Sequence, residues 1–137
     1  AMQALTKGKI TVFGGTQVRP NIHIDDICDL YLYLLRNKNI TGTFNAGFEN
    51  ISILEIAQMI KKRIGCDIVV TKSNDPRSYR LDSSKLLKTG FVPKKTVNDA
   101  ISEIIDAYQQ GRLEDQPHFH NLVWMKQNGV VERVTGQ

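Results

Sequence analysis

The side chain best suited to bind an anion is Arg19, which lies where polar and apolar residues alternate. Its planar guanidinium is permanently charged and presents a fork of donors that matches a phosphate or a carboxylate. A strand would hold this fork in one direction, and the Gln17 and Asn21 amides on the same strand would add neutral hydrogen bonds. The alternative is that Arg19 is a surface residue paired with Asp25 or Asp26. The residues alone leave both interpretations open.

A second group of polar side chains lies in the segment from Lys72 to Tyr79. Arg77 offers another guanidinium, Asp75 offers a carboxylate, and the ring of Tyr79 offers a flat face on which a ligand can pack. The alternative is an ordinary Asp-Pro turn with solvated cations around it.

The histidines and the aspartates near them are not expected to form a metal site. His118 and His120, near Asp115, have the chemistry of metal ligands, but nothing in the sequence predicts a rigid frame for them. His23 is expected to be structural. Three aspartates follow it, and we expect them to offset the partial positive charge of a helix N-terminus: Asp25, Asp26 and Asp29.

Hydrophobic periodicity and cap residues predict the elements that position these side chains. Alternating or β-rich runs predict strands over residues 9–13, 17–24, 43–47 and 67–71, the second returning antiparallel to the first. Apolar residues at three- and four-residue spacing predict helices over 25–36, 53–64, 97–108 and, from Asp82 or Ser83, to 87. Asp25 and Thr96 are the expected N-caps of two of these helices, and Ser52 with Glu55 forms a capping box.

Strands alternating with helices indicate an α/β fold, with mixed short strands and three to four helices. The 137 residues can form one core that needs no disulfide or metal. We expect an α/β domain over residues 1–111 and a C-terminal tail or docking arm over residues 112–137, where the apolar Trp124 needs a surface to pack on. Cys28 and Cys66 have no metal or redox spacing, so we expect both to be buried apolar residues.

Charge and hydropathy narrow the class of partner. Eighteen Lys and Arg against fourteen Asp and Glu give a formal net charge of +4, which mildly favours anionic ligands. Charge alone is a weak argument for nucleic acid, and we expect no nucleic-acid partner. The sequence has no apolar run of the roughly 20 residues that span a bilayer and no signal segment. We therefore expect a cytoplasmic protein with no membrane contact.

Four sequence segments together resemble one enzyme family. They are Gly8-x-Ile10-x-Val12-x-Gly14-x-x-Gln17-x-Arg19-Pro20-Asn21-Ile22-His23-Ile24-x-Asp26, then Thr43-Phe44-Asn45-Ala46-Gly47, then Asp75-Pro76-Arg77-Ser78-Tyr79-Arg80-Leu81-Asp82-x-Ser84-Lys85, and Leu87-x-x-Gly90-Phe91-x-Pro93. In this order and spacing they are similar to the C-terminal half of extended short-chain dehydrogenases/reductases. Within that family they resemble the NAD-dependent nucleotide-sugar epimerases and dehydratases. The resemblance covers residues 8 to about 108.

The family's catalytic and cofactor motifs do not occur in this sequence. Family members bind NAD through a Gly-rich loop and use a Tyr-x-x-x-Lys pair for acid–base chemistry. Here no tyrosine is followed four residues later by a lysine. Gly14-Gly15 is followed by no further glycine at the spacing of a dinucleotide-binding loop, and it opens no helix. We therefore expect no catalytic residue and no cofactor in this chain alone, with NAD a cofactor of the whole family protein. The N-terminal Rossmann half of the family is expected to be absent.

The resemblance implies a role in binding a nucleotide diphosphate-sugar. Family members hold the diphosphate with an arginine that matches Arg19, and many have Arg-x-x-Asp in the later loop, where the acid binds ribose hydroxyls. Lys72 stands at that arginine position here, so Arg77 is the expected replacement, and Asp75 matches the acid. We expect the chain to position the sugar beside a nicotinamide held elsewhere. The alternative is a non-enzymatic remnant or assembly module that pairs with itself or with a separate Rossmann subunit.

Overall fold

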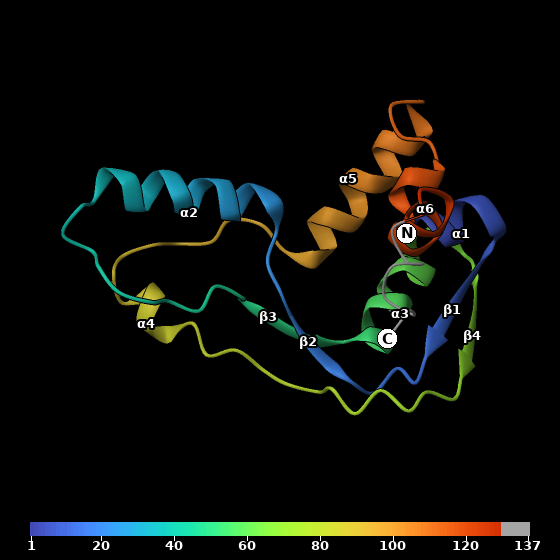
Figure 1. The fold of residues 1–137 in the computed structure, drawn as a ribbon, viewed down its shortest axis with the longest axis horizontal. Helices are drawn as coiled ribbons and strands as arrows, with labels where there is room; N and C mark the ends of the chain where they lie inside the picture. Colours follow the sequence, from blue (N-terminus) through green and yellow to red (C-terminus); the bar gives the residue numbers. More distant parts are fainter. Residues whose placement is uncertain (130–137) are drawn as a thin grey trace.

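The computed structural model describes residues 1–129, in which an antiparallel pair of short strands joins two packed groups of elements (Figure 1). The helices are α1 (Met2–Lys7), α2 (Ile24–Arg36), α3 (Ile53–Ile64), α4 (Ser84–Leu87), α5 (Val97–Gln109) and α6 (Asn121–Gln127), with a 3-10 turn at Pro117–Phe119. The strands are β1 (Lys9–Phe13), β2 (Val18–Asn21), β3 (Glu49–Ser52) and β4 (Asp67–Thr71). These short strands and helices confirm the predicted α/β class.

The strands form two separate pairs. β1 and β4 are parallel, with Lys9 opposite Asp67, whereas β2 and β3 are antiparallel, with Arg19 opposite Ile51. The prediction that the second strand returns on the first is therefore wrong. Gly14 and Gly15 have φ angles of 77° and 105°, which favour glycine, and this turn directs the chain away from β1.

The first hydrophobic core packs α1, α3 and α5 against the parallel strand pair. Its buried members come from four segments of the chain: Ala4, Ile60, Cys66 and Ile101. The predicted capping box at the start of α3 is confirmed, because Ser52 and Glu55 each accept a hydrogen bond from the other's backbone N–H. Thr96 and Asp99 make the same reciprocal contact at the start of α5. Each cap contributes about 1 kcal/mol to the stability of its helix.

The second hydrophobic core lies between α2 and α4. Leu86 is fully buried there beside Leu30 and Phe91. The rings of Tyr33 and Phe48 pack on Phe91, with centroids 5.6 and 6.0 Å from it. The two cores hold the outer elements, while the β2–β3 pair runs between them (Figure 1).

Several predicted details differ from the structure. Residues 43–47 form no strand, because the hydrogen-bonded partner of β2 is the next segment, β3. β2 ends at Asn21, and α2 begins with His23 as its N-cap in place of Asp25. His23 Nδ1 accepts the Asp25 N–H at 3.1 Å, so the imidazole takes the role expected of the carboxylate. Cys28 is exposed, whereas Cys66 is buried as expected.

The sequence does not predict α1 or α6, which have six and seven residues and are too short to show a clear period. α6 lies in the predicted tail and carries exposed apolar side chains, among them Leu122 and Trp124. Residues 130–137 of that tail lie outside the described residues. Within residues 1–129, no helix combines the length and the apolarity that a bilayer crossing needs.

Candidate functional site

β2 and the loop that follows β4 bring four of the predicted site residues together: Arg19, Asp75, Arg77 and Tyr79. Arg19 Nη2 donates to Asp75 Oδ2 at 3.2 Å, and Nη1 donates to the carbonyls of Val18, at 3.1 Å, and of Arg77. The guanidinium lies over the Tyr79 ring, 5.4 Å from its centroid. These contacts hold the Arg19 fork in one direction, with 22% of the side chain exposed. Its acidic partner is Asp75, so the expected alternative pairing with Asp25 or Asp26 is wrong.

Asp75 also binds the second guanidinium. Arg77 Nε and Nη2 donate to its two carboxylate oxygens at 2.7 and 2.8 Å, and the Arg77 N–H closes an Asp-Pro turn on Oδ1 at 3.1 Å. These hydrogen bonds and the charge of Arg77 hold the pKa of the Asp75 carboxyl far below its usual range, and the carboxylate raises the pKa of Arg77. Two guanidiniums and one carboxylate leave a net positive charge, and 75% of the Arg77 side chain is exposed. The cluster can therefore attract an anion.

Backbone hydrogen bonds hold the loop along β2. The Tyr79 N–H donates to the Val18 carbonyl at 3.2 Å, and the Val18 N–H donates to Ser78 Oγ at 3.1 Å. Further along, the Asn50 side chain on β3 accepts the Leu81 N–H at 2.9 Å and donates to the Leu81 carbonyl at 3.1 Å. Three of the clustered side chains, those of Asp75, Arg77 and Tyr79, thus lie on a loop that is fixed at two places to the strand pair that carries Arg19.

Gly47 allows the same loop to approach β2 closely. A Cβ at this position would lie 2.9 Å from the Pro20 Cβ and 3.2 Å from a Leu81 methyl group. Ser83 Oγ accepts the Gly47 N–H at 3.1 Å and donates to the Gly47 carbonyl at 3.0 Å. The segment predicted as a strand is therefore a brace between β2 and the loop.

Two other predicted site residues bind backbone groups instead of facing the cluster. Gln17 Oε1 accepts the Gly15 N–H and its Nε2 donates to the Phe13 carbonyl, both at 2.6 Å. Asn21 Nδ2 donates to backbone carbonyls on β2 and β3, at 2.8 and 3.2 Å. The Gln17 amide holds the turn after β1, and the Asn21 amide holds the strand pair.

Lys72 is exposed, and its side chain forms no hydrogen bond or ion pair with another described residue. The structure therefore gives it no place in the Arg19 cluster, in line with the weaker match of a lysine to the family's arginine position.

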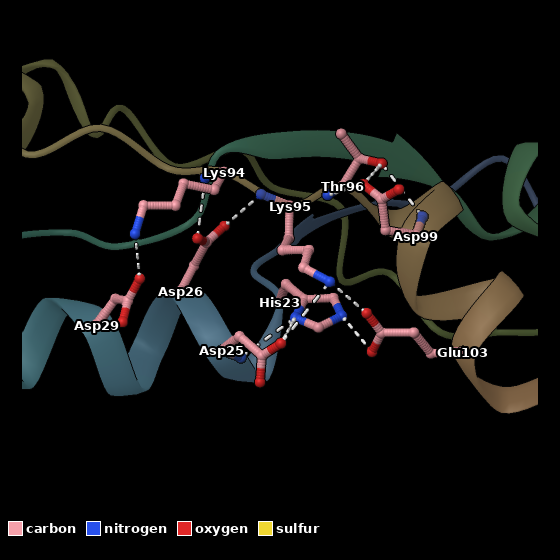
Figure 2. A network of polar contacts seen from close by, with 9 residues as sticks. All are labelled: His23, Asp25, Asp26, Asp29, Lys94, Lys95, Thr96, Asp99 and Glu103. Atoms are coloured by element: carbon pink, nitrogen blue, oxygen red, sulfur yellow. Dashed lines mark hydrogen bonds and ion pairs between the residues drawn. The ribbon is translucent and has the colours of Figure 1, made fainter. Parts of the chain in front are cut away.

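A second polar network lies between α2 and α5 (Figure 2). Asp26, which is 1% exposed, accepts the backbone N–H groups of Lys94 and Lys95 at 2.9 and 3.1 Å. Next to it, Glu103 pairs with Lys95 Nζ at 2.5 Å and with His23 Nε2 at 3.1 Å. The hydrogen bond from Lys95 lowers the pKa of Glu103 and raises the pKa of Lys95 itself.

The geometry around His23 resembles that of a metal site, but the residues do not fit one. Ligand atoms of His23, Asp25 and Glu103 lie within 4.8 Å of one another. His23 Nδ1 already accepts a backbone N–H, however, and Lys95 Nζ lies 2.5 Å from Glu103 and 3.9 Å from Asp25. The lysine ammonium thus supplies the positive charge that these carboxylates need.

Sequence reasoning missed the function of Asp26 and Asp29. We expected both to serve the start of α2, but Asp26 binds the segment before α5, and Asp29 pairs with Lys94 Nζ at 2.7 Å. The partners of Asp26 are 68 and 69 residues away, so no local pattern points to them. The one local signal is a second acidic residue directly after the residue expected to cap the helix.

Comparisons with known proteins show which enzymes this chain is similar to. No protein-family model matches the chain. GDP-L-fucose synthase 1 of Arabidopsis thaliana is 29% identical over 106 residues, which are 73% of this chain and 33% of that protein. The structure of UDP-glucuronic acid 4-epimerase from Bacillus cereus, in complex with UDP-glucuronic acid and NAD, superposes with a TM-score of 0.66 at 29% identity, over 80% of this chain and 38% of that one. RMD from Pseudomonas aeruginosa, in complex with NADPH, has the same TM-score at 18% identity, which shows the fold alone.

These similarities cover only part of each relative, because the chain spans about a third of the length of the curated relatives it matches. The motifs of the sequence, the α/β fold and the relatives point to the same family. The chain therefore has the fold of a portion of an extended short-chain dehydrogenase/reductase, and its relatives are members of that family.

Proposed function

We propose that this chain is the nucleotide-sugar-binding part of an NAD(P)-dependent epimerase, dehydratase or reductase. The observation that carries the proposal is the Arg19 guanidinium, which the Tyr79 ring and backbone carbonyls hold in one direction beside the exposed Arg77. A fixed fork next to a second guanidinium suits the two phosphates of a nucleotide diphosphate-sugar. The UDP-glucuronic acid bound to the Bacillus cereus relative belongs to this ligand class.

Binding proceeds by exchange of partners on the two guanidiniums. Phosphate oxygens replace the Asp75 carboxylate on Arg19 and Arg77, and Asp75 turns to the ribose hydroxyls. The Tyr79 ring, about half exposed, packs on the base or the sugar. The exchange conserves ionic hydrogen bonds because the guanidiniums give up one anion for another.

The contribution of this chain to catalysis is positional. Its sequence contains neither the Gly-rich loop nor the Tyr-x-x-x-Lys pair, so we assign no step of hydride or proton transfer to its residues. A Rossmann unit elsewhere supplies the nicotinamide, and the grip on the diphosphate places the sugar carbon in front of it.

A thermal-unfolding titration of the purified chain tests the proposal. UDP-, TDP-, GDP- and CDP-sugars and, separately, NAD are added, because a ligand that binds only the folded state raises the unfolding midpoint. We expect one class of nucleotide-sugar to raise the midpoint and NAD to leave it unchanged. Arg19→Ala should remove the shift, whereas Arg112→Ala, an exposed arginine next to α5, should keep it. No shift with any sugar nucleotide, or an equal shift in Arg19→Ala, would refute the proposal.

A further inference from the structure

α2 has two apolar faces, and only one of them is covered. Leu30 is buried in the second core, and Tyr33 and Leu34 pack against that core. Other apolar side chains of the helix point away from the core and are exposed: Ile24 by 64%, Tyr31 by 67%, Leu32 by 47% and Leu35 by 70%, together with the thiol of Cys28. A helix of a globular protein that is apolar on both sides is normally covered on both sides.

The exposed residues form a regular seam. Ile24, Cys28, Tyr31 and Leu35 are spaced by four, three and four residues, the period at which two helices interlock their side chains. At about 100° per residue, these four side chains lie within roughly 60° of one another around the helix axis. We call Ile24, Cys28, Tyr31, Leu32 and Leu35 the α2 stripe.

The charges beside the α2 stripe indicate what covers it. Asp25, whose side chain is 61% exposed, lies at the start of α2, and the exposed Arg36 lies at its end, on the same flank of the stripe. In an antiparallel pair of α2 helices, Asp25 of each copy faces Arg36 of the other. In a parallel two-fold pair the two Asp25 side chains would lie on opposite flanks of the interface, and neither would face an Arg36.

We propose that the α2 stripe is a self-association surface, through which two copies of this chain pair antiparallel about a two-fold axis near the middle of α2. The symmetry makes the surface self-complementary, since each apolar and each charged contact occurs twice. α2 has 13 residues and is about 20 Å long, so the interface is small. We therefore expect a weak, reversible dimer. The stripe contains no residue of the proposed nucleotide-sugar site, so either proposal can fail without the other.

Sedimentation equilibrium of the full chain over a concentration series tests the stripe. We expect the dimer fraction to rise with concentration, and Leu35→Glu to raise the dissociation constant by roughly tenfold or more, because each dimer carries the change twice. Leu122→Glu on α6 is the matched control, since that leucine is 65% exposed, and it should leave the constant unchanged. A short bismaleimide should crosslink the two Cys28 thiols of the dimer. Cys28→Ser should abolish the crosslinked product but leave the dimer detected by sedimentation.

Exchanging the charges at the two ends of α2 tests whether the two helices run antiparallel. Arg36→Glu places an acid opposite Asp25 of the other copy and should weaken the dimer, while Asp25→Lys combined with Arg36→Glu should restore it. Circular dichroism of each variant verifies that α2 is still folded. A chain that stays monomeric at all concentrations, or a dimer that is insensitive to Leu35→Glu, would overturn the proposal. A chain that stays monomeric would mean that something other than a second copy covers the α2 stripe, such as the portion of the relatives' fold that this chain does not match.

Discussion

Asp26 and Asp75 are both aspartates that accept several hydrogen bonds, but their donors differ in kind. Asp26 is almost fully buried and binds two backbone N–H groups, those of Lys94 and Lys95. Asp75, with 24% of its side chain exposed, binds the guanidinium groups of Arg19 and Arg77. Backbone amides before α5 cannot turn away from their acceptor, whereas an exposed guanidinium can change partner. The first cluster is suited to hold the fold, and the second is suited to exchange its carboxylate for a ligand.

The different donors also determine what happens when the acceptor is removed. The Lys94 and Lys95 N–H groups are partly buried against Asp26, so without that carboxylate they recover only part of their hydration, which is costly. Without the Asp75 carboxylate, the exposed Arg77 guanidinium is hydrated again, and the Arg19 guanidinium keeps its two carbonyl acceptors. Substitutions at Asp26 should therefore change stability, and substitutions at Asp75 should change binding.

The largest effect is expected for Asp26→Ala. It leaves the N–H groups of Lys94 and Lys95 without their acceptor, so we expect a loss of about 2–4 kcal/mol in the free energy of unfolding. Urea denaturation followed by circular dichroism measures the loss. Asp29→Ala is the control on the same helix, because it removes a carboxylate whose partner is the exposed ammonium of Lys94. Surface ion pairs contribute little, so equal losses in the two variants would contradict the bracing role of Asp26.

Local features of the fold could be predicted from the sequence, and long-range pairing could not. Ser52 with Glu55 and Thr96 with Asp99 are three residues apart, so both capping boxes depend on neighbouring residues only. β1 pairs with β4, 58 residues later, and no pattern within β1 identifies that partner. Residues 43–47 have the composition of a strand, but they lie beside β2 as a brace because β3 occupies the pairing edge.

The candidate site shows the same division. Chemistry and family resemblance together identified Arg19, Asp75, Arg77 and Tyr79, and the structure brings these four side chains together. The resemblance could not show that Asp75 pairs with Arg19 when no ligand is bound. Gln17 does not join these four side chains in the structure, because its amide satisfies two backbone groups of a turn that includes two glycines.

A smaller effect, on binding alone, is expected for Asp75→Asn. The change keeps the size of the side chain and removes the charge that competes for Arg19 and Arg77. We expect inorganic pyrophosphate to bind several-fold more tightly, with an affinity that falls as salt is added. Isothermal titration calorimetry measures both trends.

The affinity for a ligand that carries a nucleoside should change less in Asp75→Asn than the affinity for pyrophosphate. An asparagine binds ribose hydroxyls less well than a carboxylate, so the gain for a nucleotide diphosphate-sugar should be smaller than the gain for pyrophosphate. Asp67→Asn at the start of β4 removes the same charge away from the cluster and should change neither affinity. An unchanged pyrophosphate affinity in Asp75→Asn would show that the carboxylate does not compete with ligand.

The smallest effect is expected in the pH dependence of stability. The pKa of Asp75 is held far below its usual range by Arg77, and the pKa of Glu103 is lowered by Lys95. Because the folded pKa lies below the unfolded value of about 4, each carboxylate stabilises the fold above that pH and loses its contribution as the pH falls through the folded pKa. Unfolding midpoints measured from pH 7 to pH 2 should therefore differ slightly between the native chain and Asp75→Asn near neutrality and converge in acid. Glu103→Gln should converge likewise. A constant gap for Asp75→Asn over the whole range would mean that its pairing with the two guanidiniums does not stabilise the fold through charge.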